Sequence, residues 1–197
     1  MSAYKRKDGY YHKAKEEGYR SRAVYKLKQI DEKFNMFRED DVVVDLGAAP
    51  GSWSEYAVEM VGEDNVLAVD KERMRDIEGV SFQRGDMTDE EFIRKVSIIA
   101  GEVDVVISDM SPNITGNYEV DHARSIYLAR HALKFCFTNL KEGGRFVVKV
   151  FQGEDFEDIM EQTKRAFDSV HGYSPKASRQ SSSEMYIIAK GFHGGEG

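Results

Sequence analysis

Cysteine is almost absent from this chain of 197 residues, because Cys136 is the only one. A single thiol cannot form an internal disulfide framework, nor a metal site built on several cysteines. No apolar run approaches the roughly 20 residues that cross a bilayer, so we expect no membrane-spanning helix and no membrane partner. The first twenty residues contain no apolar core and do not resemble a secretion signal. We therefore expect a cytoplasmic protein.

Proline is also scarce, with only three in the chain: Pro50, Pro112 and Pro175. Each falls at the end of an expected strand or in a loop, so none interrupts a helix or a strand. The chain contains no repeat, no low-complexity tract and no interdomain linker. With 41% hydrophobic and 32% charged residues, this composition and length predict one globular domain over residues 1–197.

Positive charge is in deficit overall, since the formal net charge is −7 at pH 7. Residues 1–28 are an exception, because they contain nine Lys or Arg and only three acids, a local net charge of +6. The same stretch is rich in tyrosine, and cations interleaved with aromatic rings suit phosphates and bases together. We predict a basic N-terminal arm and helix, over about residues 1–37, that contacts nucleic acid. A solvated tail is the alternative.

Apolar positions recur at helical spacing in residues 21–37. Beyond them, short Val- and Ile-rich runs predict strands at 42–46, 65–70, 80–86, 102–109 and 145–151. Helical stretches alternate with these strands at 53–61, 88–99, 121–139 and 154–167. This alternation predicts an α/β fold with a mostly parallel sheet and helices on both faces. A last strand at 184–192, and a second one near 168–173, predict an antiparallel edge.

The sequence GAAPG, residues 47–51, joins the first expected strand to a helix. Gly47 and Gly51 leave room for a ligand against the backbone, at the end of the strand where α/β proteins bind ligands. The dinucleotide pattern G-x-G-x-x-G and the P-loop pattern are both absent, which argues against a nicotinamide-dependent dehydrogenase and against triphosphate binding. A plain strand–turn–helix connection remains the alternative.

Acidic residues end or directly follow the first four expected strands: Asp45, Asp70, Asp86 and Asp109. An acid after the second strand typically accepts hydrogen bonds from ribose hydroxyls. Any one of them could instead cap a turn or helix. Together they suit a ligand that has a ribose, an adenine amine and an ammonium group but no phosphate. S-adenosylmethionine has these groups and a positive sulfonium.

The motifs DLGAAPGSWS (45–54) and SDMSPN (108–113) resemble those of the FtsJ/RrmJ family of RNA ribose 2'-O-methyltransferases. The likeness extends from SRAVYKL near the start to SSSEMYIIAKGF near the end. The resemblance implies a Rossmann-like, S-adenosylmethionine-dependent methyltransferase fold over the single domain. It implies cofactor contacts from Gly51, Trp53, Asp70, Asp86 and Asp109. The glycine-rich turn adds Gly47 and Pro50 to this set.

The resemblance also implies a catalytic set of Lys26, Asp109, Lys149 and Glu184. Lys149 lies inside the apolar run FVVKVF, where burial would disfavour a charged ammonium. The neutral amine is the form that removes a proton, so we predict that Lys149 is the general base for the 2'-hydroxyl. A lysine at a strand edge that reaches solvent is the alternative. Asp109 and Glu184 would hold the two ammonium groups, and we expect Lys26 mainly to position RNA.

The RNA that the resemblance implies is large-subunit ribosomal RNA, methylated at a uridine. A chain with so little RNA-reading surface favours a structured target, such as the assembled ribosomal particle, and we expect it to act as a monomer. Methylation of transfer RNA and a non-catalytic role in ribosome assembly are the alternatives. Phosphate contacts are expected from Lys5, Arg6, Lys7, Lys13, Arg20, Arg22 and Arg179.

Other chemistry fits these residues less well. Cytosine C5 methylation needs a nucleophilic cysteine, but Cys136 falls in an apolar helical segment, where core packing is its expected role. Enzymes that methylate the adenine amine usually place an aromatic residue in the turn after the fourth strand, and SDMSPN lacks one. The five histidines show no metal-ligand spacing, so we predict no metal site.

Overall fold

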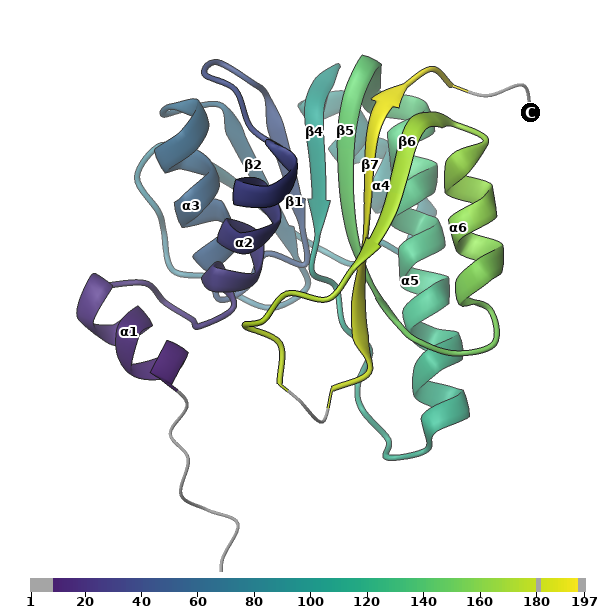
Figure 1. Cartoon of the computed structure of the whole chain (residues 1–197). Coiled ribbons are helices and arrows are strands. Elements are labelled where there is room, and N and C mark those ends of the chain that lie inside the picture. The colour runs from purple at the N-terminus through teal and green to yellow at the C-terminus, as the bar shows by residue number, and fades with distance from the viewer. Residues whose placement is uncertain (1–8, 180–181, 195–197) are drawn as a thin grey trace, which may run out of the picture.

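The computed structural model of the chain describes residues 9–179 and 182–194 (Figure 1). Lys5, Arg6 and Lys7, for which we predicted RNA contact, lie outside the described residues. Among the described residues, no helix is long and apolar enough to cross a membrane. The elements are α1 (Gly9–Glu17), α2 (Val24–Phe34), β1 (Val43–Leu46), α3 (Ser52–Val61), β2 (Val66–Asp70), β3 (Val80–Arg84), α4 (Glu90–Ala100), β4 (Val103–Ser108), α5 (Tyr118–Asn139), β5 (Leu140–Phe151), α6 (Phe156–Lys164), β6 (Phe167–Tyr173) and β7 (Glu184–Phe192).

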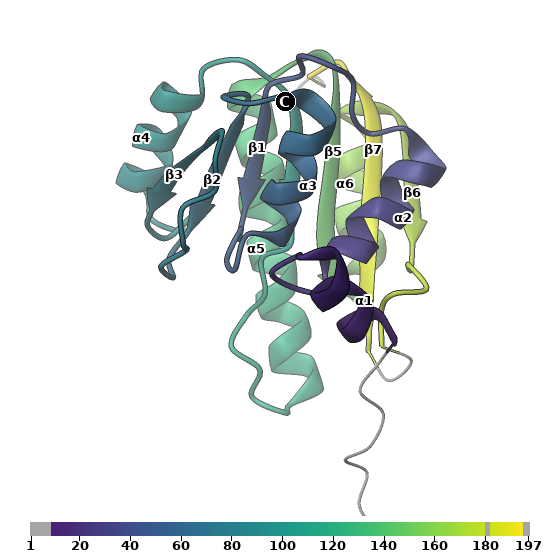
Figure 2. The same ribbon diagram turned by 90° about the vertical axis from the view of Figure 1, so that its left-hand side faces the viewer.

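The strands form one seven-stranded sheet in the order β3-β2-β1-β4-β5-β7-β6. Strands β1 to β5 are parallel, and β7 is antiparallel to both β5 and β6. Helices α2 and α3 cover one face of the sheet, and α4, α5 and α6 cover the other (Figures 1 and 2). The predicted α/β fold with a mostly parallel sheet and an antiparallel edge is therefore confirmed.

The central strands are mostly apolar because helices cover both of their faces. Along β1, Val44 and Leu46 pack with side chains of α4, α5 and α6, whereas Val43 packs with α2 and α3. Successive side chains of a strand point to opposite faces. Asp45 therefore points to the α3 side, where its Oδ2 accepts a hydrogen bond of 2.6 Å from the hydroxyl of Ser54. The alternation thus places a carboxyl inside the core, just before the glycine-rich turn.

The helix predicted over residues 154–167 is too long at both ends, because α6 spans Phe156–Lys164. Phe167 instead begins β6, where its ring centroid lies 6.0 Å from that of Phe146 and 5.1 Å from that of Phe192. A short apolar run does not by itself distinguish a buried helix from a buried strand. The contacts of Phe167 with β5 and β7 favour the strand here.

The basic arm contains α1, a helix that its sequence pattern did not reveal. Ala14 of α1 is buried in a small cluster with Tyr25 and Ala177. The ring of Tyr10 lies 5.4 Å from the ring of Tyr25 on α2. These contacts hold α1 beside the start of α2 (Figure 2).

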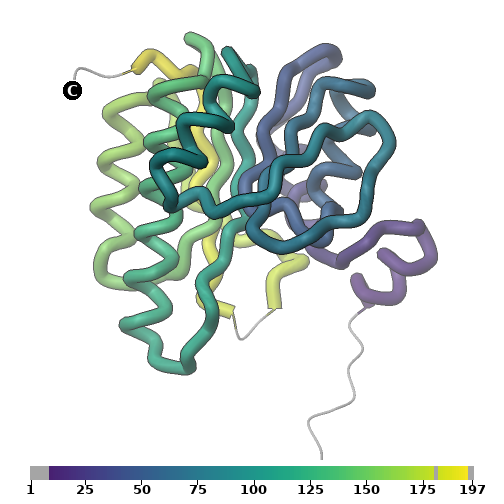
Figure 3. The backbone as a smooth tube through the Cα atoms, turned by 180° about the vertical axis from the view of Figure 1, so that it is seen from behind, coloured from purple at the N-terminus to yellow at the C-terminus, as the bar shows by residue number. Residues whose placement is uncertain are grey.

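The carboxyl ends of the parallel strands meet at the lower end of the sheet in Figure 1. Both α1 and the first turns of α5 project beyond the sheet at this end, on different sides (Figures 1 and 3). This end is therefore bordered on two sides, by what we call the α1–α2 wall and the α5 wall. The α1–α2 wall comprises α1, α2 and the connection between them. The α5 wall comprises the start of α5 and the loop at residues 109–117 before it. Ligands of open α/β sheets bind at this end.

A buried ion pair ties β5 to the connection between α2 and β1. Arg145 is only 4% exposed, its Nη2 lies 2.7 Å from Oδ1 of Asp41, and its Nη1 donates to the Met36 carbonyl at 2.8 Å. Replacing Arg145 with Met leaves the buried carboxylate of Asp41 without its partner. We expect the free energy of unfolding, measured with urea, to fall by about 3–5 kcal/mol.

The matched control is Arg130→Met, which breaks an exposed ion pair with Asp158 of α6. Exposed pairs contribute little, so this variant should lose less than about 1 kcal/mol. Equal losses in the two variants would show that burial of the Arg145 pair has no special weight.

Candidate active site

A cavity of about 680 Å³ lies at the carboxyl ends of the strands, within the size range of small-molecule sites. The loops after β1, β2, β3 and β4 form most of its lining, and α5 closes one side. Residues that line it include Gly47, Asp70, Asp86, Asp109, Asn113 and Tyr127.

Gly47 occupies the point where the loops after β1 and β4 cross. Its φ angle is +78°, and a Cβ atom there would lie 2.7–2.8 Å from side-chain and backbone atoms of Met110. No side chain fits at such distances, so only glycine allows the two loops to approach this closely. The crossing brings Asp109, next to Met110, up to the end of β1.

Two of the cavity carboxylates are held in place by backbone amides. Asp70 accepts hydrogen bonds from the amides of Ala49, at 2.9 Å, and Glu72, at 2.7 Å. Oδ1 of Asp86 accepts from the amide and the hydroxyl of Thr88, at 2.9 and 2.8 Å. The bonds from Thr88 lower the pKa of Asp86, so its carboxylate is ionised. Each carboxylate is oriented in advance to accept further hydrogen bonds from a ligand.

Pro50, Gly51 and Trp53 do not line the cavity in the described structure. Gly51 lies beneath Met74 and Ile77 of the loop after β2. The Trp53 indole is buried and donates from Nε1 to the carbonyl of Ala23 at 2.9 Å. Cofactor contact by these three residues remains a prediction.

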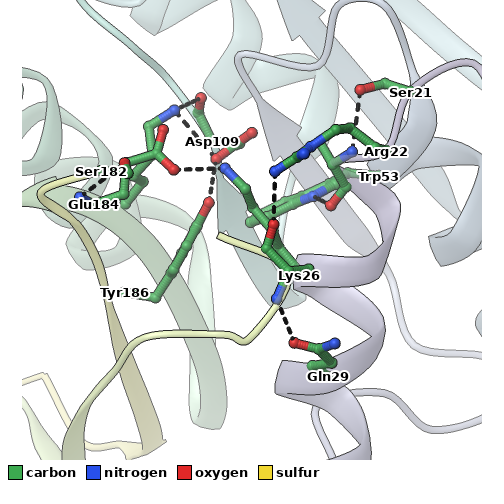
Figure 4. A network of polar contacts seen from close by, with 12 residues as sticks. Ser21, Arg22, Lys26, Gln29, Trp53, Asp109, Ser182, Glu184 and Tyr186 are labelled. Carbon is green, nitrogen blue, oxygen red and sulfur yellow. Dashed lines mark hydrogen bonds and ion pairs between the residues drawn. The ribbon is translucent and has the colours of Figure 1, made fainter. Parts of the chain in front are cut away.

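The catalytic set predicted from the sequence comes together around Asp109, which lines the cavity. Figure 4 labels three of its members, Lys26, Asp109 and Glu184. Lys149 is 5% exposed, and its Nζ lies 2.9 Å from the main-chain oxygen of Asp109 and 3.2 Å from Oδ1 of that residue. Nζ of Lys26 lies 2.6 Å from Oε2 of Glu184. The structure thus pairs each of the two lysines with one carboxylate.

Strand register explains how residues so far apart in the chain meet. Lys149 of β5 lies directly opposite Tyr186 of β7, and Phe151 lies opposite Glu184. Asp109 directly follows β4, which is parallel to β5 on its other side. Helix α2 contributes Lys26 from the face above.

Tyr186 joins the two ion pairs, and the sequence reasoning missed it. Its hydroxyl donates to Oδ1 of Asp109 at 2.8 Å, and the ammonium of Lys26 lies 5.9 Å from its ring centroid. Burial, and then the nearby Asp109 and Glu184, raise the pKa of Tyr186, so the phenol remains a donor. The available signal was a tyrosine inside an apolar strand, because a buried tyrosine hydroxyl usually has a partner.

The predicted RNA-contacting residues that the structure describes fall into two groups. Arg22 lies within electrostatic reach of both Arg179 and Glu184: burial and then Arg179 lower the pKa of Arg22, and Glu184 opposes this change. Arg22 also donates to the carbonyl of Ala177 at 2.8 Å. Lys13 lies on α1, and Arg20 lies in the connection between α1 and α2.

Arg20 makes many contacts within the protein. Its Nε lies 2.8 Å from Oε1 of Glu55, and its guanidinium also donates to the carbonyls of Arg75 and Asp76, each at 2.6 Å. It therefore holds the loop after β2 against the start of α3. RNA contact by Arg20 remains a prediction.

Metal-ligand clusters are not found in the described part of the chain, where no group of three or more His, Cys, Asp or Glu could hold an ion. Cys136 is buried in the core, as predicted.

The donor and acceptor set of the cavity fits S-adenosylmethionine. Carboxylates from three successive loops suit a ligand with hydroxyl, amine and ammonium donors. Gly47 lines the same cavity. No P-loop is present in the turn to bind a triphosphate.

Comparisons with known proteins agree with this geometry. The family model of the FtsJ-like methyltransferases matches residues 19–192. A ribosomal RNA large subunit methyltransferase E from Methanothrix thermoacetophila is 52% identical over 185 residues, which cover 93% of this chain and 72% of the relative. The enzyme of the same name from Natronomonas pharaonis is 52% identical over 187 residues, 94% of this chain and 74% of the relative.

Solved structures show the same fold. A crystal structure described as a ribosomal RNA methyltransferase from Plasmodium falciparum has a TM-score of 0.79 and 28% identity, and the match covers 90% of this chain and all of that one. A structure described as an rRNA methylase from Clostridium thermocellum has a TM-score of 0.57 and 19% identity, covering 84% and 97% of the two chains. The second likeness concerns the fold alone.

The burial of Asp45 near other carboxyl groups can be tested through its pKa and the pH dependence of stability. The residue is fully buried, and Oδ1 accepts no hydrogen bond in the described structure. Burial, and to a smaller extent Asp109 and Asp70, raise its pKa to about 7, although the bond from Ser54 opposes this. In the unfolded chain the group titrates near 4. The native state therefore binds one more proton than the unfolded state between these values.

Stability should fall as the pH rises through this window, because the unfolded chain loses the proton first. A gap of about three pKa units corresponds to about 4 kcal/mol. We expect the free energy of unfolding of the wild type to fall by about this much relative to Asp45→Asn between pH 4 and pH 8, measured by urea titrations. Parallel pH profiles would show that Asp45 is already ionised in the native protein.

Proposed function

The chain belongs to the FtsJ-like methyltransferase family, and from this we propose that it transfers a methyl group from S-adenosylmethionine to a ribose 2'-hydroxyl of RNA. The observation that carries the proposal is the pair of buried lysines beside the cavity, each on its own carboxylate. A methyl transfer to a hydroxyl needs a group that removes the proton and groups that hold the sugar in line. The four residues supply both.

The cofactor, when bound, supplies an electrophilic methyl group on a positive sulfonium. Asp70 would accept hydrogen bonds from its ribose hydroxyls, and Asp86 from its adenine amine. Asp109 would face its ammonium group. Gly47 would contact the cofactor through its backbone, and Pro50, Gly51 and Trp53 would contact it from the same turn. All of these residues except Pro50, Gly51 and Trp53 line the cavity.

Lys149 is the proposed general base. Its ammonium is buried and has two oxygen atoms of Asp109 as neighbours, so the nitrogen is fixed in position. The hydroxyl of Tyr186 donates to the same carboxylate, which adds to this fixation. As the general base, the Lys149 nitrogen in its free amine form would take the proton of the 2'-hydroxyl.

Lys26 and Glu184 would orient the target ribose and its phosphate. Glu184 holds Nζ of Lys26 at 2.6 Å, and the remaining N–H donors of this lysine can bind a phosphate oxygen. Arg22 and Arg179 add positive charge on the same side. Lys13 and Arg20 belong to the α1–α2 wall, which would follow the RNA backbone. Lys5, Arg6 and Lys7 lie outside the described residues, and RNA contact by them is proposed from the sequence alone.

The proposed substrate is large-subunit ribosomal RNA, at a uridine. The two archaeal relatives carry the name of a large-subunit ribosomal RNA methyltransferase, and this supports ribosomal over transfer RNA. We further propose that the chain is a single methyltransferase domain with a basic RNA-contacting arm. It would act as a cytoplasmic monomer, on a structured target such as the ribosomal particle.

Substitution of Lys149 tests the proposed base. Lys149→Ala should lower the rate of methyl transfer by about 100- to 10,000-fold, the range of general base catalysis. The affinity for S-adenosylmethionine, measured by calorimetry, should stay within a few-fold of the wild type. The matched control is Lys141→Ala on the same strand, which removes an ion pair with Asp104 at the far end of β5. Wild-type turnover by Lys149→Ala would exclude Lys149 as the base.

The position of the methyl group can be measured with methyl-labelled S-adenosylmethionine and three RNA pools: large ribosomal subunits, naked ribosomal RNA and transfer RNA. Alkali cleaves RNA through a free 2'-hydroxyl, so a 2'-O-methyl group protects its own linkage. We expect label in alkali-resistant dinucleotides, with the highest yield from ribosomal RNA or subunits.

Each other result of this assay excludes part of the proposal. Label in mononucleotides would mean base methylation. The highest yield from transfer RNA would replace the substrate. Absence of label from every pool, despite measurable cofactor binding, would favour a non-catalytic assembly factor.

A further inference from the structure

Tyr118, the first residue of α5, is an exposed aromatic ring that is held in one orientation. The residue is 57% exposed. Its hydroxyl donates to the carbonyl of Gln152, and its ring stacks on that of His122 with 6.4 Å between centroids and 12° between planes. The ring is therefore held beside His122 while more than half of the residue stays exposed to solvent.

The imidazole beneath Tyr118 is itself fixed to the end of β5. Nδ1 of His122 lies 2.8 Å from the carbonyl of Phe151, and Nε2 lies 3.1 Å from the amide of Asp155. A carbonyl only accepts and an amide only donates, so Nδ1 carries the proton and Nε2 accepts. His122 thus cannot turn without losing both bonds, and Tyr118 rests on a rigid support.

The loop before Tyr118 is equally well anchored. Asp121 is buried and accepts hydrogen bonds from the amide and hydroxyl of Thr115, both at 2.8 Å, and from the amide of Gly116 at 3.1 Å. Asn117 caps α5 by accepting from the amides of Glu119 and Val120. An exposed ring with this much support is ready to bind a ligand without further ordering, which favours affinity.

Tyr118 lies close enough to Lys149, the proposed general base, for a single nucleotide to contact both residues. Its partner Gln152 follows β5 directly and donates to the carbonyl of Ser183, next to Glu184. Gln152 is three residues from Lys149, which corresponds to about 10 Å along a strand. A sugar whose 2'-hydroxyl is at Lys149 can therefore direct its base toward Tyr118.

Charge on the α5 wall favours a neutral group. The first turn of α5 carries the exposed acid Glu119, which repels phosphates. Ile114, in the loop before it, is exposed and apolar. The opposite wall carries Lys26, Arg22 and Arg179. A nucleotide between the two walls would direct its phosphate to the basic side and its base to the α5 wall.

We propose that Tyr118 stacks on the base of the target nucleotide and so positions its ribose for methylation. This inference rests on the proposed function. Proteins that act on RNA commonly hold unpaired, splayed-out bases against aromatic side chains. The stacking would be tolerant of base identity, because every base has a π-face. Tyr118 is thus a positioning residue that touches the substrate and takes no part in proton transfer.

Steady-state kinetics on unmethylated large ribosomal subunits test this role. Tyr118→Leu keeps an apolar side chain but removes the ring, and it should lower kcat/KM for RNA by about 5- to 150-fold, the range of one base–aromatic stack. The loss should appear mainly in KM, with unchanged affinity for S-adenosylmethionine. Tyr118→Phe keeps the ring and should retain nearly full activity.

The matched control is Phe137→Leu, which removes another exposed aromatic ring from the same helix. Phe137 is 50% exposed and lies nineteen residues farther along α5, about 28 Å away. This variant should be as active as the wild type. Unchanged kinetics in Tyr118→Leu would overturn the inference. The inference would also be overturned if Tyr118→Leu lowered the affinity for S-adenosylmethionine and the melting temperature together with kcat/KM, because the ring would then be structural.

Ultraviolet crosslinking of the wild type to large-subunit ribosomal RNA, with the crosslinked peptide identified by mass spectrometry, does not depend on methyl transfer. A crosslink at Tyr118 is expected, and crosslinks elsewhere without one at Tyr118 would overturn the inference. If the wild type methylates no RNA, the proposed function fails, and this experiment still decides whether Tyr118 contacts RNA.

Discussion

Antiparallel pairing between β5 and β7 is the constraint on which the candidate active site depends. The register places Tyr186 opposite Lys149 and Glu184 opposite Phe151. A shift of one residue would turn these side chains to the other face of the sheet. Tyr186 could then no longer reach Asp109, and Glu184 could no longer meet Lys26. The edge at which the sheet departs from parallel order is therefore the part that assembles the chemistry, because it brings the end of the chain back beside its middle.

The same strand shows that buried charge can serve two purposes. Arg145 and Lys149 both lie on β5, and both are buried and paired with an aspartate. Arg145 has no access to the cavity, and its partner Asp41 lies in the connection before β1. It acts as a structural tie. Lys149 instead pairs with Asp109, a residue that lines the cavity. Because a buried pair adds little stability over apolar packing, its position beside a cavity is better explained by chemistry.

The two walls at this end of the sheet differ in chemistry. The α1–α2 wall carries cations on a docked helix and its neighbour, and Arg179 lies beside them. The α5 wall carries Glu119 and the exposed side chains of Tyr118 and Ile114, and Asp121 fixes the loop before the helix. A strand of RNA has charge on one side and apolar bases on the other, so this asymmetry would give the proposed substrate one preferred orientation. The cavity carboxylates continue this separation, because they attract the donor groups of the cofactor and disfavour phosphate.

The sequence by itself determined the α/β fold and the antiparallel edge, which follow from periodicity along the chain, a local property. Its motifs DLGAAPGSWS and SDMSPN carried the resemblance to the family, and that resemblance implied the four residues of the candidate site. Tertiary structure alone decided the burial of Asp45 among carboxyls that otherwise line a cavity. It also decided the internal contacts of Arg20, the link through Tyr186 and the fixed orientation of Tyr118. Each of these depends on partners far away in the sequence, and a local pattern cannot specify which distant groups will meet.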